Sequence, residues 1–64
     1  MHELNLSKAE EIETTLSSGR SIKWMGQTIL FRTHLFGKDY YWMRDGDGTH
    51  YLSHIGDDGL PDLA

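Results

Sequence analysis

The segment that most limits how this chain can fold is residues 40–55, YYWMRDGDGTHYLSHI. Two runs rich in aromatic and β-branched residues flank the sequence DGDG at residues 45–48. Glycine supplies the positive φ angles that a tight turn needs, so this pattern predicts a β-hairpin. The rest of the chain therefore has to fit around two antiparallel strands.

The chain has 64 residues and no cysteine. A domain of this size buries only about 60% of its unfolded surface, so we expect one small domain spanning residues 1–64 and no deep active-site cleft. The lack of cysteine excludes a disulfide framework, a thiolate zinc site and a thiol nucleophile, and it favours an intracellular protein. Neither a signal peptide nor a bilayer-spanning apolar run is recognisable, so we expect a soluble, cytoplasmic protein without a membrane partner.

An N-terminal helix is predicted over about residues 8–18. Ser7 and Glu10 match a capping box, in which each side chain accepts a hydrogen bond from the other residue's backbone. Gly19 suits the left-handed position that follows a helix. Ile12 and Leu16 lie on one stripe at helical spacing, and this narrow apolar stripe needs a sheet to cover it.

From residue 21 onwards the pattern alternates with a period of two, which is typical of strands. Strands are predicted at about 21–24, 27–36, 40–44 and 49–55. The last residues, 56–64, mix glycine, proline and aspartate and are expected to form an irregular acidic tail. The predicted fold class is therefore α+β, with one N-terminal helix packed on a four-stranded antiparallel β-meander.

Turn lengths fix the strand register and so sort the side chains between the two faces of the sheet. With Gly46-Asp47 central in its turn, Trp42 is expected opposite Tyr51. A three-residue loop at 37–39 sets Tyr40 opposite Phe36. The face expected to pack against the helix holds Ile22, Trp24, Ile29, Phe31, Leu35, Tyr41, Met43 and Leu52. The other face holds Leu30, Arg32, His34, Phe36, Tyr40, Trp42, Arg44, Tyr51 and Ser53.

That second face has no obvious cover, because only one helix is predicted. Large aromatic side chains beside arginines are what protein interfaces favour. The alternative is that Leu60 and Leu63 of the tail fold back over this face, or that strand twist hides the rings. Both interpretations stay open at the level of the sequence.

The net charge of −4 is concentrated in the second half of the chain. Residues 37–64 carry Lys38 and Arg44 against Asp39, Asp45, Asp47, Asp57, Asp58 and Asp62. Aspartate is a good turn residue, which is one explanation for this excess. The other is that the loop carboxylates present an acidic edge to a basic partner.

No complete catalytic or metal-binding arrangement is recognisable in the sequence. Asp45 begins a DxDGT sequence that resembles the first motif of haloacid-dehalogenase-type phosphatases, but the chain has no room for that family's parallel sheet and later motifs. An EF-hand starting at Asp45 would need glycine and glutamate where His50 and Gly56 stand. His50 and His54 share a strand face without a third ligand and are interpreted as solvent or interface histidines. We therefore expect no catalytic residue, no metal and no cofactor.

The leading functional hypothesis is a small acidic binding protein, not an enzyme, that inhibits a macromolecule by occupying its surface. In size, acidity, lack of cysteine and helix-plus-meander plan, the chain resembles the short inhibitors carried by phages and mobile elements, anti-CRISPR proteins among them. This resemblance implies a protein partner with a basic nucleic-acid-binding groove, which carboxylates block by imitating phosphate charge. The residues expected to contact the partner are Asp39, Asp45, Asp47, Asp57, Asp58, Tyr40, Trp42, Arg44 and Tyr51.

The alternative hypothesis is a single-stranded nucleic-acid-binding module. Aromatic side chains of the sheet stack bases in such modules while cations contact the phosphates. The candidate residues are Tyr40, Trp42, Tyr51 and Phe36 for stacking, and Arg32, Arg44 and Lys38 for phosphate contacts. The negative net charge disfavours this alternative. In a third arrangement, the aromatic face is buried in a homodimer.

Overall fold

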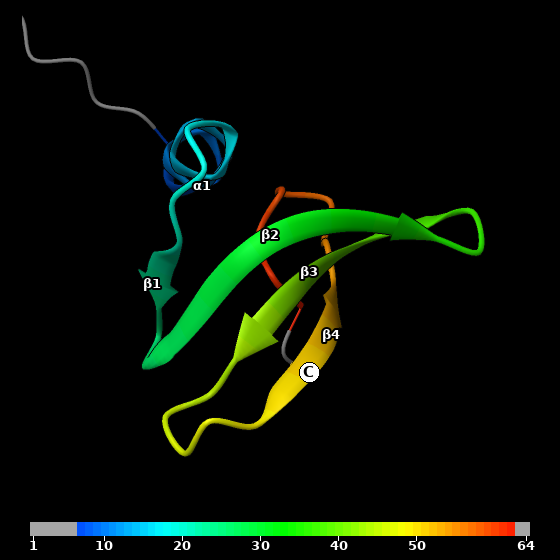
Figure 1. The fold of residues 1–64 in the computed structure, drawn as a ribbon. Coiled ribbons are helices and arrows are strands. Elements are labelled where there is room, and N and C mark those ends of the chain that lie inside the picture. The colour runs from blue at the N-terminus through cyan, green and yellow to red at the C-terminus, as the bar shows by residue number, and fades with distance from the viewer. Residues whose placement is uncertain (1–6, 63–64) are drawn as a thin grey trace, which may run out of the picture.

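The computed structural model describes residues 7–62. It contains one helix and one antiparallel sheet of four strands in the order β1-β2-β3-β4, as Figure 1 shows. The elements are α1 (Lys8–Ser17), β1 (Ile22–Trp24), β2 (Gln27–Leu35), β3 (Lys38–Arg44) and β4 (His50–His54). The predicted α+β class and the helix-plus-meander plan are confirmed.

Local signals at both ends determine the extent of α1. The Ser7 Oγ atom accepts a hydrogen bond from the Glu10 amide at 3.2 Å, and Glu10 Oε1 accepts one from the Ser7 amide at 3.0 Å. These contacts with the Ser7 backbone and side chain lower the pKa of Glu10. At the other end, Gly19 adopts a φ of +83°, and its amide donates to the Leu16 carbonyl. The predicted capping box and C-terminal glycine are thus both present.

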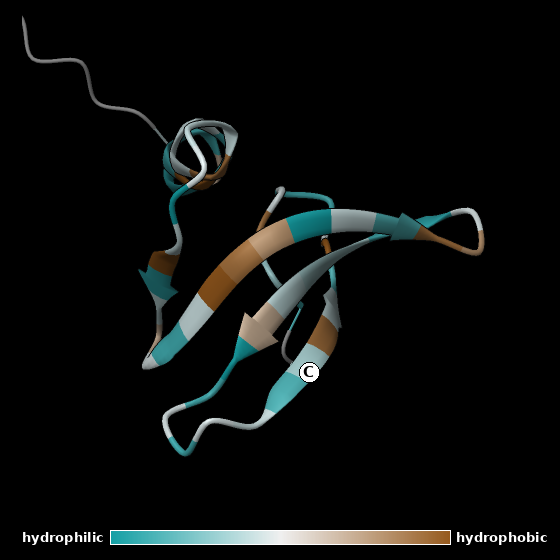
Figure 2. Cartoon of the chain, viewed as in Figure 1, coloured by the Kyte–Doolittle hydropathy of each residue, from teal (hydrophilic) through white to brown (hydrophobic). Residues whose placement is uncertain are grey.

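The core lies between α1 and one face of the sheet, which we call the inner face. Ile12 from α1, Ile29 from β2 and Met43 from β3 are completely buried, and Tyr41 is almost so. Further side chains pack against this cluster: Leu16, Ile22, Trp24, Tyr51, Ile55 and Leu60. Figure 2 shows the hydrophobic part of α1 turned toward the sheet. We call the opposite sheet face the outer face.

The segment after β4 also covers the inner face. The amide of Gly56 donates to the Leu60 carbonyl at 2.8 Å, and the amide of Asp62 donates to the His54 carbonyl at 2.7 Å. The Tyr41 hydroxyl donates to the Gly59 carbonyl at 2.8 Å. Through residue 62 the segment contains turns but no helix or strand, and these hydrogen bonds hold it against the sheet. Since Leu60 packs against the core, the alternative interpretation in which it covers the outer face is wrong, and Leu63 lies outside the described residues.

The register of β3 and β4 differs by one residue from the prediction. Trp42 lies opposite Leu52 rather than Tyr51. The Gly48 amide closes the turn onto the Asp45 carbonyl, and Gly48 itself adds a residue with a φ of +93° before β4 begins. This is the three-residue hairpin loop with a glycine bulge, not the two-residue loop that the prediction assumed.

The β2–β3 register was also predicted wrongly. Phe36 and Gly37 form a two-residue turn with positive φ at both positions, so Leu35 lies opposite Lys38. Both φ angles fit a type I′ turn, which matches the twist of the flanking strands. Farther along, a bulge between Ile29 and Phe31 adds one residue to β2. The predicted pairing of Ile22 with Ile29 is confirmed.

These shifts exchange several side chains between the two faces, because a slip of one residue turns a strand over. Tyr51 and Ser53, predicted on the second face, are on the inner face, where Tyr51 packs against the core and Ser53 is buried. Arg32 and His34 also lie on the helix side. The residues predicted inside but found on the outer face are Phe31, Leu35 and Leu52.

Candidate functional site: the outer face of the sheet

Five ring side chains meet on the outer face. Phe31 stacks on Trp42 with ring centroids 6.4 Å apart, and Trp42 stacks on His50 at 5.6 Å. Tyr40 contacts His54 at 4.6 Å in a tilted arrangement. Since Phe31 pairs with Trp42 and Tyr40 pairs with His54 across neighbouring strands, the register itself brings these rings together.

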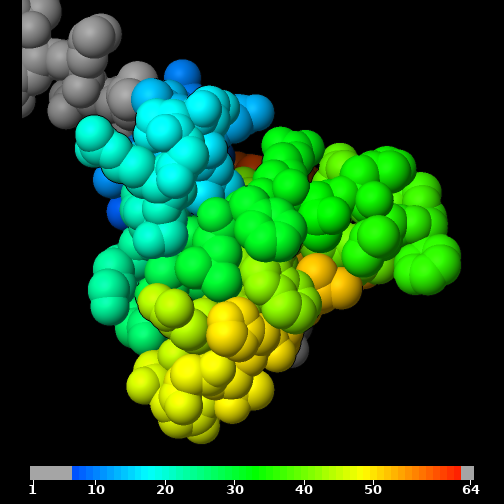
Figure 3. Space-filling model, in the orientation of Figure 1, coloured from blue at the N-terminus to red at the C-terminus, as the bar shows by residue number. Residues whose placement is uncertain are grey.

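The outer face is open and largely apolar. Phe31 is 51% exposed, Leu52 41% and Leu35 38%, whereas Trp42 and Tyr40 are half-buried between their neighbours. Figure 3 shows that neither α1 nor the C-terminal segment covers this side of the sheet. Contiguous exposed apolar surface is uncommon on small soluble proteins and is typical of binding sites.

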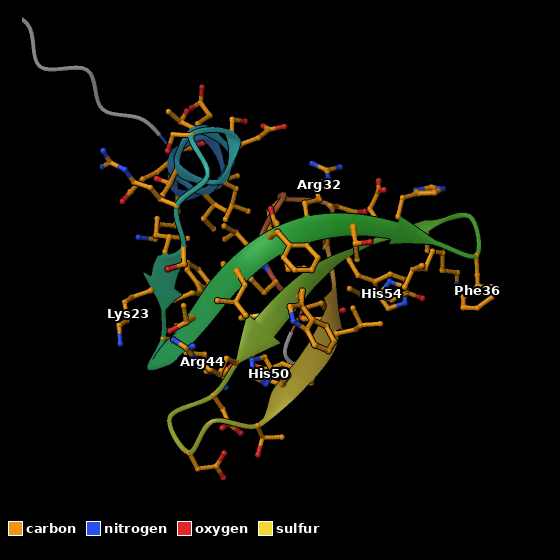
Figure 4. All side chains as sticks on the ribbon, in the orientation of Figure 1. Lys23, Arg32, Phe36, Arg44, His50 and His54 are labelled. Carbon is orange, nitrogen blue, oxygen red and sulfur yellow. The ribbon has the colours of Figure 1, made fainter. Side chains whose placement is uncertain are left out.

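The charges on the outer face are all cationic. Lys23, Arg44 and Lys38 alternate along their strands with inward-facing residues and are exposed. Figure 4 shows Lys23, Arg44 and His50 toward one end of the sheet and His54 toward the other. Among the outward positions of the four strands, all of them within the described residues, none holds a carboxylate.

Asp39, a predicted partner-binding residue, lies on the helix side of β3. Its Oδ2 atom accepts a hydrogen bond from Arg32 Nη2 at 3.2 Å, and its Oδ1 atom lies 2.7 Å from His34 Nδ1. The contact with His34 and the bond from Arg32 lower the pKa of Asp39. Arg32 is also paired with Glu13 of α1, at 3.6 Å. The Asp39 carboxylate is therefore already engaged within the chain.

The other predicted aspartates lie in turns at the two ends of β4. Asp45 Oδ1 accepts hydrogen bonds from the amides of Asp47 and Thr49, both at 3.1 Å, and Asp47 Oδ1 accepts one from Thr49 at 2.9 Å. The contact with the Asp45 side chain has the largest effect on the pKa of Asp47, and the contacts with Thr49 add to it, so that this pKa falls to about 2. Beyond β4, Asp58 Oδ1 accepts the Leu60 amide at 3.0 Å. Asp57 is exposed in the same turn.

The predicted contact residues therefore separate into distinct groups. Tyr40, Trp42 and Arg44 lie together on the outer face, as predicted. Tyr51 lies on the inner face, and burial raises the pKa of its hydroxyl. The residues that lie on this surface but were not in the predicted contact set include Phe31, Lys23, Leu35, Leu52, His50 and His54. Of these, only the two histidines carried a sequence signal, since their spacing places them on one strand face.

A small cavity of about 270 Å³ lies between α1 and strands β2 and β3. It is lined by Glu13, Leu16, Ser17, Phe31, Arg32 and Tyr41. The Arg32–Glu13 ion pair is part of its wall. The described residues contain no cluster of three or more histidines and carboxylates that would hold a metal ion. In the same part of the chain, no helix has the length and apolar character to cross a membrane.

The fold and the surface define a small α+β protein with one covered and one open sheet face. Comparison with protein-family models, with curated proteins and with solved structures finds no match to this chain. The chemistry of the outer face is therefore the best indication of what the protein binds.

Proposed function

We propose that this protein is a non-catalytic binding module that takes single-stranded nucleic acid on the outer face of its sheet. The observation that carries this proposal is the row of stacked rings, Phe31 on Trp42 and Trp42 on His50, flanked by cations without a carboxylate on that face. Sheet-based binders of single strands combine these same features.

The rings supply contacts for bases. A base stacked on an aromatic side chain contributes about 1–3 kcal/mol, and stacking tolerates any base because every base has a π-face. Phe31 is half exposed and offers its ring directly to a ligand. The Tyr40–His54 pair lies farther along the same hairpin and forms a second stacking position.

The cations supply contacts for phosphates. Lys23 and Arg44 lie beyond the rings at one end, and Lys38 lies at the other. The chain's charge of −4 opposes nucleic-acid binding at long range, but charges more than about 8 Å apart are largely screened at physiological salt. At short range the outer face is positive, because, among the described residues, Lys23, Lys38 and Arg44 hold outward strand positions and no aspartate or glutamate does.

The size of the face limits the length of the ligand. β2 has nine residues, which corresponds to about 30 Å of extended strand. A site of this length holds about four nucleotides, the lower end of the range for small sheet-based binders. We therefore expect affinity to stop rising once an oligonucleotide exceeds the length of the face.

Tryptophan fluorescence tests the proposal directly. In a Trp24→Phe variant, Trp42 is the only tryptophan, because the chain has two. Titration with a ten-nucleotide oligothymidylate at low salt should quench its emission, and Phe31→Ala should weaken binding at least about five-fold, since one stacked base is lost. Arg44→Gln should also weaken binding. Arg20→Gln, which changes the same charge at an exposed position after α1, is the matched control. An absence of quenching would refute the proposal.

The second candidate is the inhibitor of a protein partner, of the anti-CRISPR type. The exposed aliphatic side chains Leu35 and Leu52 support it, because they suit a protein surface better than a row of bases. On this hypothesis Asp57 and Asp47 supply acidic contacts at the rim. Asp→Asn substitution at these two positions should then weaken inhibition of the partner and reduce its salt dependence, and unchanged inhibition would remove the charge-mimicry idea.

A further inference from the structure

Phe36 stands apart from the other aromatic residues of the chain. It occupies the tip of the β2–β3 hairpin and is 96% exposed. Figure 4 shows it at the far end of the hairpin, away from α1. The ring takes part in none of the ring contacts among the described residues. No packing interaction within the described chain therefore accounts for an aromatic side chain at this position.

The backbone makes a phenylalanine at this position costly as well. Phe36 has a φ of +53° and Gly37 a φ of +76°, the combination of a type I′ turn. Asparagine, aspartate or glycine is preferred at the first of these two positions, and a bulky residue with positive φ is a conformational outlier. Strained residues of this kind concentrate at functional sites, where the side chain has a role outside the fold.

Phe36 lies beyond the rings of the outer face along the same hairpin. Tyr40 pairs with Thr33, so the Tyr40–His54 contact lies three residues before the tip, about 10 Å along the strand. Lys38, which is opposite Leu35, lies between them. The order along the hairpin toward its tip is therefore a ring pair, a cation and then an exposed ring.

We infer that Phe36 is the terminal stacking contact of the nucleic-acid-binding face, holding the nucleotide beyond the Tyr40–His54 pair while Lys38 contacts the phosphate between them. This inference rests on the proposed function. It adds the hairpin tip to the binding site, whereas the proposed function needs only the stacked rings and cations of the outer face.

Substitution at the tip separates binding from folding. Phe36→Asn introduces a residue that tolerates positive φ, so the thermal midpoint of unfolding should not fall, while affinity for the ten-nucleotide oligothymidylate should fall about five-fold or more. Phe36→Trp keeps a ring at the tip and should retain the affinity. Met25→Asn is the matched control, because Met25 is 77% exposed, has a φ of +46° and forms the equivalent turn between β1 and β2, at the other end of β2.

The outcomes distinguish the inference from the proposed function. If the unsubstituted protein fails to bind the oligonucleotide, the proposed function fails and the role of Phe36 fails with it. If the unsubstituted protein binds but Phe36→Asn binds equally well, only the role of Phe36 is overturned. A loss of affinity in Phe36→Asn that Met25→Asn does not share, with retention in Phe36→Trp, supports the inference.

Discussion

Replacement of Gly59 by alanine should destabilise the protein strongly, because Gly59 combines two constraints. Its φ is +79°, a conformation that costs an alanine about 1–2 kcal/mol. A Cβ atom at Gly59 would also lie 2.9 Å from the Ala9 Cβ atom of α1, closer than two carbon atoms approach in folded proteins. Relief of that clash requires the C-terminal turn to move away from the helix, which adds about 1–3 kcal/mol as in overpacked cores.

The total, about 2–5 kcal/mol from these two effects, is a large part of the about 3–10 kcal/mol expected for 64 residues. Urea denaturation followed by tryptophan fluorescence measures the loss. Gly19→Ala is the control, since Gly19 has a similar φ of +83° but no atom of residues 7–62 lies within 4 Å of an added Cβ. The two variants share the conformational effect, so their difference isolates the contact with Ala9. Equal denaturation midpoints for Gly59→Ala and Gly19→Ala would refute the packing of the C-terminal turn on α1. The outer face stays open because this turn packs on the helix side of the sheet, so that explanation would fail as well.

Two further predictions concern the tyrosines and the acidic turn. Among the described residues, the buried Tyr51 hydroxyl has no hydrogen-bond partner, so Tyr51→Phe should leave the free energy of unfolding unchanged or raise it by up to about 1 kcal/mol. Tyr41→Phe should lower the free energy of unfolding by about 1 kcal/mol, because the bond to the Gly59 carbonyl is lost. Urea denaturation measures both effects, and a larger loss of stability in Tyr51→Phe than in Tyr41→Phe would contradict this prediction. Folding lowers the pKa of Asp47 from 3.8 to about 2. The ionised Asp47 carboxylate therefore stabilises the folded state above pH 4, and this stabilisation is lost as the pH falls toward 2. Asp47→Asn should therefore reduce the dependence of stability on pH in this window, and an unchanged acid-unfolding profile would contradict that expectation.

The helix and the presence of each strand followed from local signals. The Ser7–Glu10 capping box and Gly19 act within a few residues of the helix ends, so sequence alone locates α1 to within one residue. Alternating patterns likewise indicate where strands run, because each strand has one buried face. The inner positions of β3, Tyr41 and Met43, were predicted correctly for this reason.

The register was not predictable from the same signals. The register depends on how many residues each turn contains. That number is set by turn residues with positive φ, and the sequence does not specify which residues adopt this conformation. Gly48 adds a residue to one hairpin, and Phe36 adopts a left-handed conformation that its side chain disfavours. The bulge before Phe31 adds a third shift. Together these shifts moved Tyr51 out of the predicted site and brought Phe31 into it.

The salt dependence of oligonucleotide binding tests the role of the outer face most directly. Each phosphate contact with a single strand contributes about −0.7 to the slope of log affinity against log salt concentration, so contacts from Lys23, Lys38 and Arg44 predict a slope of about −2. Arg44→Gln should reduce that slope to about −1.4, and Arg20→Gln should leave it unchanged. A slope near zero, or one that both variants change equally, would contradict the assignment of the phosphate contacts to this face.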